Sequence, residues 1–182
     1  MLRELSDEFR KLGKYVVQQS RSNLTKSGIS KGELYNSLAY SLSEPSTNVY
    51  DLKFTAVDYA TFIDKGVRGA DPSLVKNGKQ KGAGSPYSYH SKMPPMLAIR
   101  AWAKQKNIRL RDEKGRFEKG NYNTIAFILQ RRIFAQGIAP TMFFTKPFLK
   151  GIEKFTPLLQ IALGRDVDEL IRLNLELQNK IQ

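Results

Sequence analysis

The sequence contains no cysteine and a single histidine, His90, among its 182 residues. Without cysteine the chain can form no disulfide and has no thiolate nucleophile. A zinc site usually takes three or four cysteine, histidine or carboxylate ligands, and most of these donors are missing. The GxGxxG and GxxxxGK(S/T) motifs that bind dinucleotides and nucleoside phosphates are missing too. These absences favour a protein that is not an enzyme and uses no cofactor or metal, and we interpret His90 as a solvated loop residue.

Long apolar runs are also missing. No stretch approaches the roughly 20 apolar residues that a helix needs to cross a bilayer. The N-terminal MLRELSDEFRKLGK mixes acids with bases and has no apolar segment typical of a secretory signal. We therefore expect no membrane association.

Acidic residues are scarce in the middle third of the chain. The net charge is +13 overall; residues 65–120 hold 14 Lys/Arg and 4 Asp/Glu, whereas residues 1–64 hold eight of each. The excess positive charge is therefore concentrated in one region. Such a region attracts polyanions or an acidic protein surface.

Two periods of apolar residues predict the elements of the first third. Residues 2–20 carry apolar side chains at steps of three and four, which is typical of an amphipathic helix. Residues 37–43 and 49–57 alternate apolar with polar side chains, and the turn-forming EPSTN separates them. We expect a β-hairpin there.

The later elements are mostly helical. Pro94 and Pro95 open a predicted helix that reaches about residue 107, and a second predicted helix spans about 122–136 and ends at Gly137. Between them, IRLRDEKGRF predicts a short hairpin. The apolar residues 141–144 predict a third main strand. Pro147 begins a helix that Pro157 interrupts, and a final helix, 166–182, begins near Asp166 because Asp166 and Glu169 have capping-box spacing.

Residues 64–92 show no sustained period and are rich in glycine, serine and lysine. Loops longer than about 12–15 residues are uncommon inside compact domains. We therefore expect residues 65–92 to form an extended basic loop that is mobile in an isolated chain and becomes ordered against another protein. The predicted architecture is one α+β domain over 1–182, with a small, mostly antiparallel sheet packed with helices, this loop insertion and C-terminal helices.

Two readings of the charged residues stay open beside a protein-binding one. Lysines of the loop, with Tyr87 and Tyr89 to stack on bases, would suit a nucleic acid-binding protein without sequence preference. Asp51, Asp58 and Asp64 are spaced like a metal-dependent nuclease cluster, although acids near a turn are common by chance. The lysines in question are Lys76, Lys79, Lys81 and Lys92.

Three motifs follow one another along residues 30–155. GELYNSLAY comes after the first helix, YATFIDKG ends the second predicted strand, and GIAPTMFFTKPFLKGIEK leads into the closing helix. In this order they resemble the neck or tail-completion proteins of tailed bacteriophages, including the minor tail components of lambdoid phages. MPPMLAIRAWAKQKNI followed by RDEKGRF is similar to segments inserted in many such proteins. Asp64 stands where that family usually has glutamate, and the basic insertion is longer.

The resemblance implies a structural virion protein rather than an enzyme. Such proteins are assembled in the host cytoplasm and form homo-oligomeric rings, of six or twelve copies, that join the portal–connector complex of the head to the tail. Their partners are copies of themselves, the portal or connector and tail proteins, with DNA passing nearby in the channel. Under this reading Tyr59 and Phe62 anchor a strand end in the core, Asp64 pairs with a cation of its own or an adjacent subunit, and Gly66 releases the loop.

The residues expected at contacts between subunits or with other virion proteins come from the strand end, the basic region and the C-terminal helices. Leu173 and Leu175 are included because they lie partly off the apolar stripe of the last helix. Two interpretations of that helix stay open: it packs against a partner chain as well as its own core, or it has a wide core-facing stripe. The expected set is Tyr59, Phe62, Asp64, Lys65, Gly66, Arg68, Lys76, Lys79, Lys81, Tyr87, Tyr89, Arg111, Arg116, Pro147, Phe148, Leu173 and Leu175.

Overall fold

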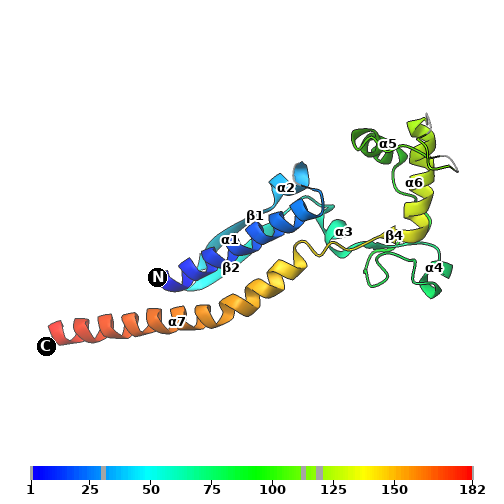
Figure 1. The fold of residues 1–182 in the computed structure, drawn as a ribbon. Helices are drawn as coiled ribbons and strands as arrows, with labels where there is room; N and C mark the ends of the chain where they lie inside the picture. The colour runs from blue at the N-terminus through cyan, green and yellow to red at the C-terminus, as the bar shows by residue number, and fades with distance from the viewer. Residues whose placement is uncertain (1, 30–31, 112–113, 118–120, 182) are drawn as a thin grey trace. The chain divides into compact units, whose positions relative to one another are not determined.

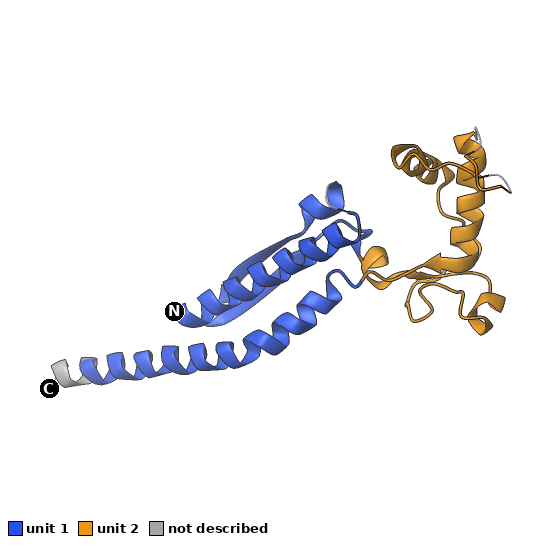
Figure 2. Ribbon diagram, in the orientation of Figure 1, with its two compact units in different colours: residues 1–60, 142–182 blue, residues 61–141 orange. Residues whose placement is uncertain are grey.

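The structure, a computed structural model, describes residues 2–29, 32–111, 114–117 and 121–181. The chain divides into two compact units, one of residues 1–60 with 142–182 and the other of residues 61–141 (Figure 2). Helices predominate and the strands form two small antiparallel sheets, so the predicted α+β class is confirmed. The expectation of a single domain stays a prediction.

The first unit packs a helical pair and a hairpin together (Figure 1). It contains α1 (Arg3–Lys26), α2 (Glu33–Ser37), β1 (Ala39–Ser46), β2 (Val49–Thr55) and α7 (Thr145–Ile181). The predicted hairpin is confirmed, with Tyr40 opposite Phe54 and Leu42 opposite Leu52 in an antiparallel register. These four side chains are partly buried, while the alternating positions between them are exposed, as the period of two predicts.

The core of the first unit forms where α1, β2 and α7 meet. Leu12, Val16 and Phe155 are at most 6% exposed, and Leu52 and Phe54 pack against them. Two glycines allow the close approach of the elements. A Cβ at Gly13 would overlap the ring of Tyr40, and one at Gly151 would lie 2.9 Å from Leu12 Cδ1. Helix α1 therefore sits directly on both the hairpin and α7.

Helix α1 is longer than predicted. It continues past residue 20, where the predicted helix ends, to Lys26. Leu24 is fully buried in the last turns, and Ser20 is buried as well. Tertiary packing of this additional face outweighs the modest helix propensities of serine, asparagine and threonine.

The C-terminal segment differs from the prediction in two ways. Residues 141–144, predicted as a strand, form the approach and turn before α7, and α7 then runs unbroken through Pro157 to Ile181. Proline removes one hydrogen bond of a helix, from its own missing N–H to the carbonyl four residues earlier. Here that carbonyl belongs to Glu153, which is exposed like Pro157 itself, so water can satisfy it. The predicted break at Pro157 and the separate helix 166–182 are therefore wrong.

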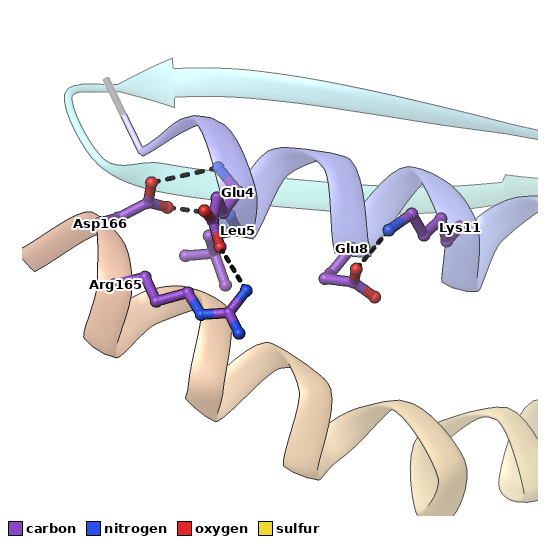
Figure 3. A network of polar contacts seen from close by, with 6 residues as sticks. All are labelled: Glu4, Leu5, Glu8, Lys11, Arg165 and Asp166. Atoms are coloured by element: carbon purple, nitrogen blue, oxygen red, sulfur yellow. Dashed lines mark hydrogen bonds and ion pairs between the residues drawn. The ribbon is translucent and has the colours of Figure 1, made fainter.

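Asp166 caps a different helix from the one predicted. Leu2 precedes α1 and offers no side-chain cap, and Asp166 of α7 takes that place (Figure 3). Its Oδ1 accepts a hydrogen bond from the Glu4 backbone N–H at 3.1 Å, and its Oδ2 accepts one from the Leu5 N–H at 2.9 Å. Asp166 is 3% exposed. A carboxylate at a helix N-terminus satisfies free N–H groups and opposes the positive end of the helix dipole.

The second unit holds short elements and two longer helices. They are α3 (Ala60–Lys65), whose first residue belongs to the other unit, β3 (Val67–Arg68), α4 (Ser73–Lys76), α5 (Met96–Gln105), α6 (Tyr122–Gln136) and β4 (Gly137–Ile138). Helices α5 and α6 match their predictions, and Gly137 ends α6 with a φ of +82° and an N–H bonded to the Ile133 carbonyl. Of the hairpin predicted in IRLRDEKGRF, the bridge between Arg111 and Phe117 is confirmed; residues 112–113 lie outside the described residues.

Candidate subunit interface

The basic segment 65–92 is folded onto its own unit. Strand β3 pairs antiparallel with β4 and, on its other side, Arg68 bridges to Ser88 in parallel. Further along, the Ala70 N–H donates to the Phe134 carbonyl at 2.8 Å, and the Lys81 N–H donates to the Gln136 carbonyl at 2.6 Å. The prediction of an extended loop without internal structure is therefore wrong. The segment lacks periodicity because backbone hydrogen bonds, rather than an apolar stripe, hold it.

Glycines make this backbone packing possible. A Cβ at Gly69 would overlap the Ala135 carbonyl oxygen, and one at Gly82 would lie 2.6 Å from the Ile138 carbonyl oxygen. Gly82 and Gly137 also have positive φ, which side chains disfavour. The glycines that suggested a flexible loop instead let the end of α6 and β4 approach the segment closely.

The stretch that ends the predicted second strand is a helix. Strand β2 ends at Thr55, and residues 60–65 form α3. Tyr59 and Phe62 are 40% and 41% exposed, so the prediction that they anchor a strand end in the core is wrong. Asp64 is 4% exposed and therefore offers little surface to a cation of another subunit. Lys65 is exposed. Gly66 is buried with a φ of +72°, and a Cβ at this position would lie only 2.5 Å from the Ile138 carbonyl oxygen.

Aromatic rings of the second unit line a surface depression of about 550 Å³. Phe62 and Tyr87 meet edge to face, with ring centroids 4.5 Å apart, and both line it. Tyr89 lines the depression as well, and its ring centroid lies 5.9 Å from that of Phe134. Burial raises the pKa of Tyr89. The remaining lining residues are Val67, Pro86, Ser88 and Ile138. Three of the residues expected at an interface are thus brought together around one apolar hollow.

Four cations of the same region stay on the surface. Arg68, Lys76, Lys79 and Lys81 are all exposed, and none makes an ion pair with another residue in the described ranges. Arg111 lies over the Phe117 ring at 4.4 Å and donates to the Gly115 carbonyl, which ties it to its own short hairpin. Arg116 is exposed in that hairpin.

Two of the expected interface residues belong to the core of the first unit. Pro147 is buried in the first turn of α7. Phe148 packs its ring edge to face against Phe54, with centroids 5.9 Å apart, and stacks on Phe144 at 5.7 Å. Both are therefore explained by packing within the unit.

Helix α7 carries the largest set of exposed apolar side chains. Leu173 and Leu175 are 49% and 55% exposed, in agreement with an apolar surface beyond the core-facing stripe. The sequence analysis named only Leu173 and Leu175 of this surface, because it divided α7 into shorter helices. The other exposed apolar residues of α7 are Leu149, Ile152, Leu158, Ile161, Leu163, Val167, Leu170 and Ile171.

The acids and His90 are the side chains that a metal site or a nuclease would use. No three His, Cys, Asp or Glu side chains gather there in a way that could hold a metal ion. Asp51 lies on the exposed face of β2, 3.9 Å from the Lys53 ammonium, whereas Asp64 is buried in the other unit. His90 is exposed and shares a hydrogen bond with the Ser88 hydroxyl at 2.7 Å.

Comparison with protein-family models, with curated proteins and with solved structures gives no significant match. None of the helices in the described part of the chain combines the length and the hydropathy of a membrane-crossing segment.

Proposed function

We propose that this protein is a structural component of a tailed-phage particle, a neck or tail-completion subunit that assembles with copies of itself and joins the head to the tail. The exposed apolar surface of α7 carries the proposal. Ten Leu, Ile and Val side chains of this helix are between 38% and 61% exposed. An apolar surface of this extent is typical of a protein–protein contact rather than of an isolated subunit.

The order of the motifs from GELYNSLAY to TKPFLKGIEK, which resembles that of neck and tail-completion proteins, supports the role in head–tail joining. The second unit supports an assembly role independently, because it presents an aromatic depression together with exposed cations. That combination suits a partner surface that is apolar at its centre and acidic at its rim. A stable ring requires each pairwise contact to bury more than about 1,000 Å².

The test is assembly of particles with and without the protein. In a phage whose copy of this gene is disrupted, we expect full heads and separate tails to accumulate, as counted by electron microscopy. Adding the purified chain to the extract should join them. Heads and tails that join at normal yield without the protein would contradict the proposal.

The exposed lysines favour a second candidate, binding of nucleic acid without sequence preference. Lys76, Lys79 and Lys81 are exposed in a region of net charge +10. If they contact phosphates, log K should fall with log[salt] at a slope of about −0.9 per phosphate on duplex DNA. Changing all three to alanine should then flatten the slope by up to about 3, whereas Lys26→Ala in the other unit should leave it unchanged. A flat response of the wild-type protein would eliminate this candidate.

A further inference from the structure

The end of α7 repeats apolar residues at alternate steps of four and three. Leu163, Val167 and Leu170 follow this spacing, Asn174 takes the next position, and the sequence continues it at residues 177 and 181, which are leucine and isoleucine. In heptad terms, leucine occupies every d position from 163 to 177, and the a positions are Val, Asn and Ile. This is the composition that favours a parallel, two-stranded coiled coil.

This seam is not the face with which α7 packs on α1. The α1-facing side chains include Phe155, Ala162 and Asp166, which are 3–6% exposed, whereas Leu163, Val167 and Leu170 are 38–42% exposed. At 3.6 residues per turn the two sets lie about 80° apart around the helix. Packing on α1 therefore does not bury the seam.

The seam continues onto a part of α7 that extends past α1. Asp166 meets the first turn of α1, and α7 runs on from there to Ile181 (Figure 1). Isolated helices shorter than about 12–15 residues are marginal in water, and most helical stability comes from packing of an apolar face. The end of α7 extends a longer helix, and pairing of its apolar face would stabilise it further.

Asn174 identifies the partner as a second copy of the chain. A single asparagine at an a position reduces the stability of a coiled coil but specifies register, because its amide finds a matching amide in the partner helix. In two identical helices that match occurs only when they run parallel and in register. The Asn174 Nδ2 donates to the Leu170 carbonyl at 3.0 Å.

The charge of the segment also suits self-association. Residues 163–181 hold three Lys/Arg and four Asp/Glu, in a chain whose net charge is +13. Two copies therefore repel each other less through this segment than through the basic region. Ile171 and Leu173 occupy the e and g positions beside the seam, where they widen the apolar contact, and Leu175 lies at b, away from it.

We infer that residues 163–181 pair in parallel and in register with the same segment of a second copy, as a two-stranded coiled coil. The pairing uses the same exposed side chains of α7 as the proposed function, but it is argued from their heptad spacing rather than from the order of the motifs. Within a ring it would group the subunits in pairs.

Cysteine scanning of the full-length chain tests the pairing directly, because the protein has no cysteine of its own. A disulfide forms only where two Cα atoms come within about 4.4–6.8 Å. Asn174→Cys lies on the seam and should give covalent dimers on oxidation, seen on a non-reducing denaturing gel. The matched control is Leu175→Cys, which is one residue away and 55% exposed in the wild type. It should cross-link at least about tenfold more slowly. Equal rates, or no dimer from either variant, would overturn the inference.

Sedimentation of a seam variant gives a second readout. The wild-type chain should be at least dimeric, and Leu170→Asp should raise the Kd of the dimer by about 100-fold or more, because it places two carboxylates in the seam. Leu149→Asp is the control, since Leu149 is also exposed on α7 but lies outside the seam. A wild-type protein that stays monomeric at high concentration, or an equal effect of both variants, would contradict the pairing. Head–tail joining is measured on particles, whereas pairing is measured on the purified chain and its seam variants, so the failure of one proposal can be distinguished from the failure of the other.

Discussion

The two units of this protein are stabilised in different ways. The first unit relies on interlocking side chains, with Leu12, Val16 and Phe155 at its centre and a cluster of phenylalanines beside them. The second holds its basic segment largely through backbone hydrogen bonds and through glycines that let one chain segment lie against another. A core of interlocking side chains is sensitive to the loss of buried side-chain volume. A segment packed backbone against backbone is instead sensitive to added volume, because a methyl group at a glycine would overlap neighbouring backbone atoms.

The largest effect is expected from truncating the core of the first unit. Phe155→Ala removes a ring that is 6% exposed and lies 5.7 Å from the Tyr15 ring. Loss of a buried phenylalanine costs about 3–5 kcal/mol, so the free energy of unfolding of this unit should fall by that amount. Hydrogen exchange resolved by peptide measures it in the first unit. Leu149→Ala on the same helix, at a side chain 61% exposed, should change the value by less than about 0.5 kcal/mol. Similar losses for both variants would contradict a core at Phe155.

An added methyl group should destabilise the second unit. Gly69→Ala places a Cβ against the Ala135 carbonyl, which is backbone and cannot rotate away. Overpacking of this kind costs about 1–3 kcal/mol. We expect faster hydrogen exchange in residues 65–92 and at the end of α6, with the first unit unchanged.

Gly84→Ala is the control for that change. No atom lies within 4 Å of the position a Cβ would take at Gly84, and its φ is not positive. It should be neutral or stabilise by about 0.4–1 kcal/mol, because alanine restricts the unfolded chain. Equal destabilisation by both variants would show that glycine itself, rather than the close approach at Gly69, matters in this segment.

The cap of α1 by Asp166 should have an intermediate effect. Asp166→Ala leaves the Glu4 and Leu5 N–H groups without their acceptor, and loss of a cap costs about 0.5–2 kcal/mol. Urea unfolding of the first unit and exchange of those two amides measure the loss. The neighbouring Arg165–Glu4 ion pair, at 3.3 Å, is exposed, so Arg165→Ala should change stability by less than about 1 kcal/mol. A larger effect of Arg165→Ala than of Asp166→Ala would show that the ion pair, rather than the cap, stabilises the contact between α1 and α7.

The smallest effect concerns alkaline pH. Burial raises the pKa of Tyr89 above its ordinary value of about 10. Its folded-state pKa therefore exceeds its unfolded-state pKa, so the neutral ring contributes stability that is fully present below pH 10 and is lost as the pH rises through the folded-state pKa. Tyr89→Phe should make the stability of the second unit fall less steeply above pH 10. Identical slopes for the two proteins would contradict the shift.

Local patterns in the sequence located many of the elements. The period of two in residues 37–43 and 49–57 predicted the hairpin, and Gly137 predicted the end of α6, because both depend on neighbours in the chain. The same reasoning failed at residues 141–144, where a short apolar run forms a turn whose Phe143 is buried. Four apolar residues fit a strand and a buried turn equally well.

The residues expected at an interface divide into exposed and buried ones. Leu173, Leu175 and the loop cations are exposed, whereas Pro147 and Asp64 are buried and Phe148 is partly buried. An aromatic residue or a proline in the sequence fits a core and an interface equally well, since cores and interfaces both bury apolar surface. Burial depends on which segments meet, and a single sequence does not record that.

The sequence by itself determined where the charge lies, the period of the two hairpin strands, the end of α6 at Gly137 and the heptad spacing of residues 163–181, because each of these is a relation between near neighbours. Only the tertiary structure decided that Asp166 caps α1 from about 160 residues away, that α7 continues through Pro157, and that segment 65–92 lies on the end of α6. The physical reason is the same in each case. A hydrogen bond or a buried face formed between distant segments outweighs local propensities of a few tenths of a kcal/mol, of the order that separates most residues in a helix.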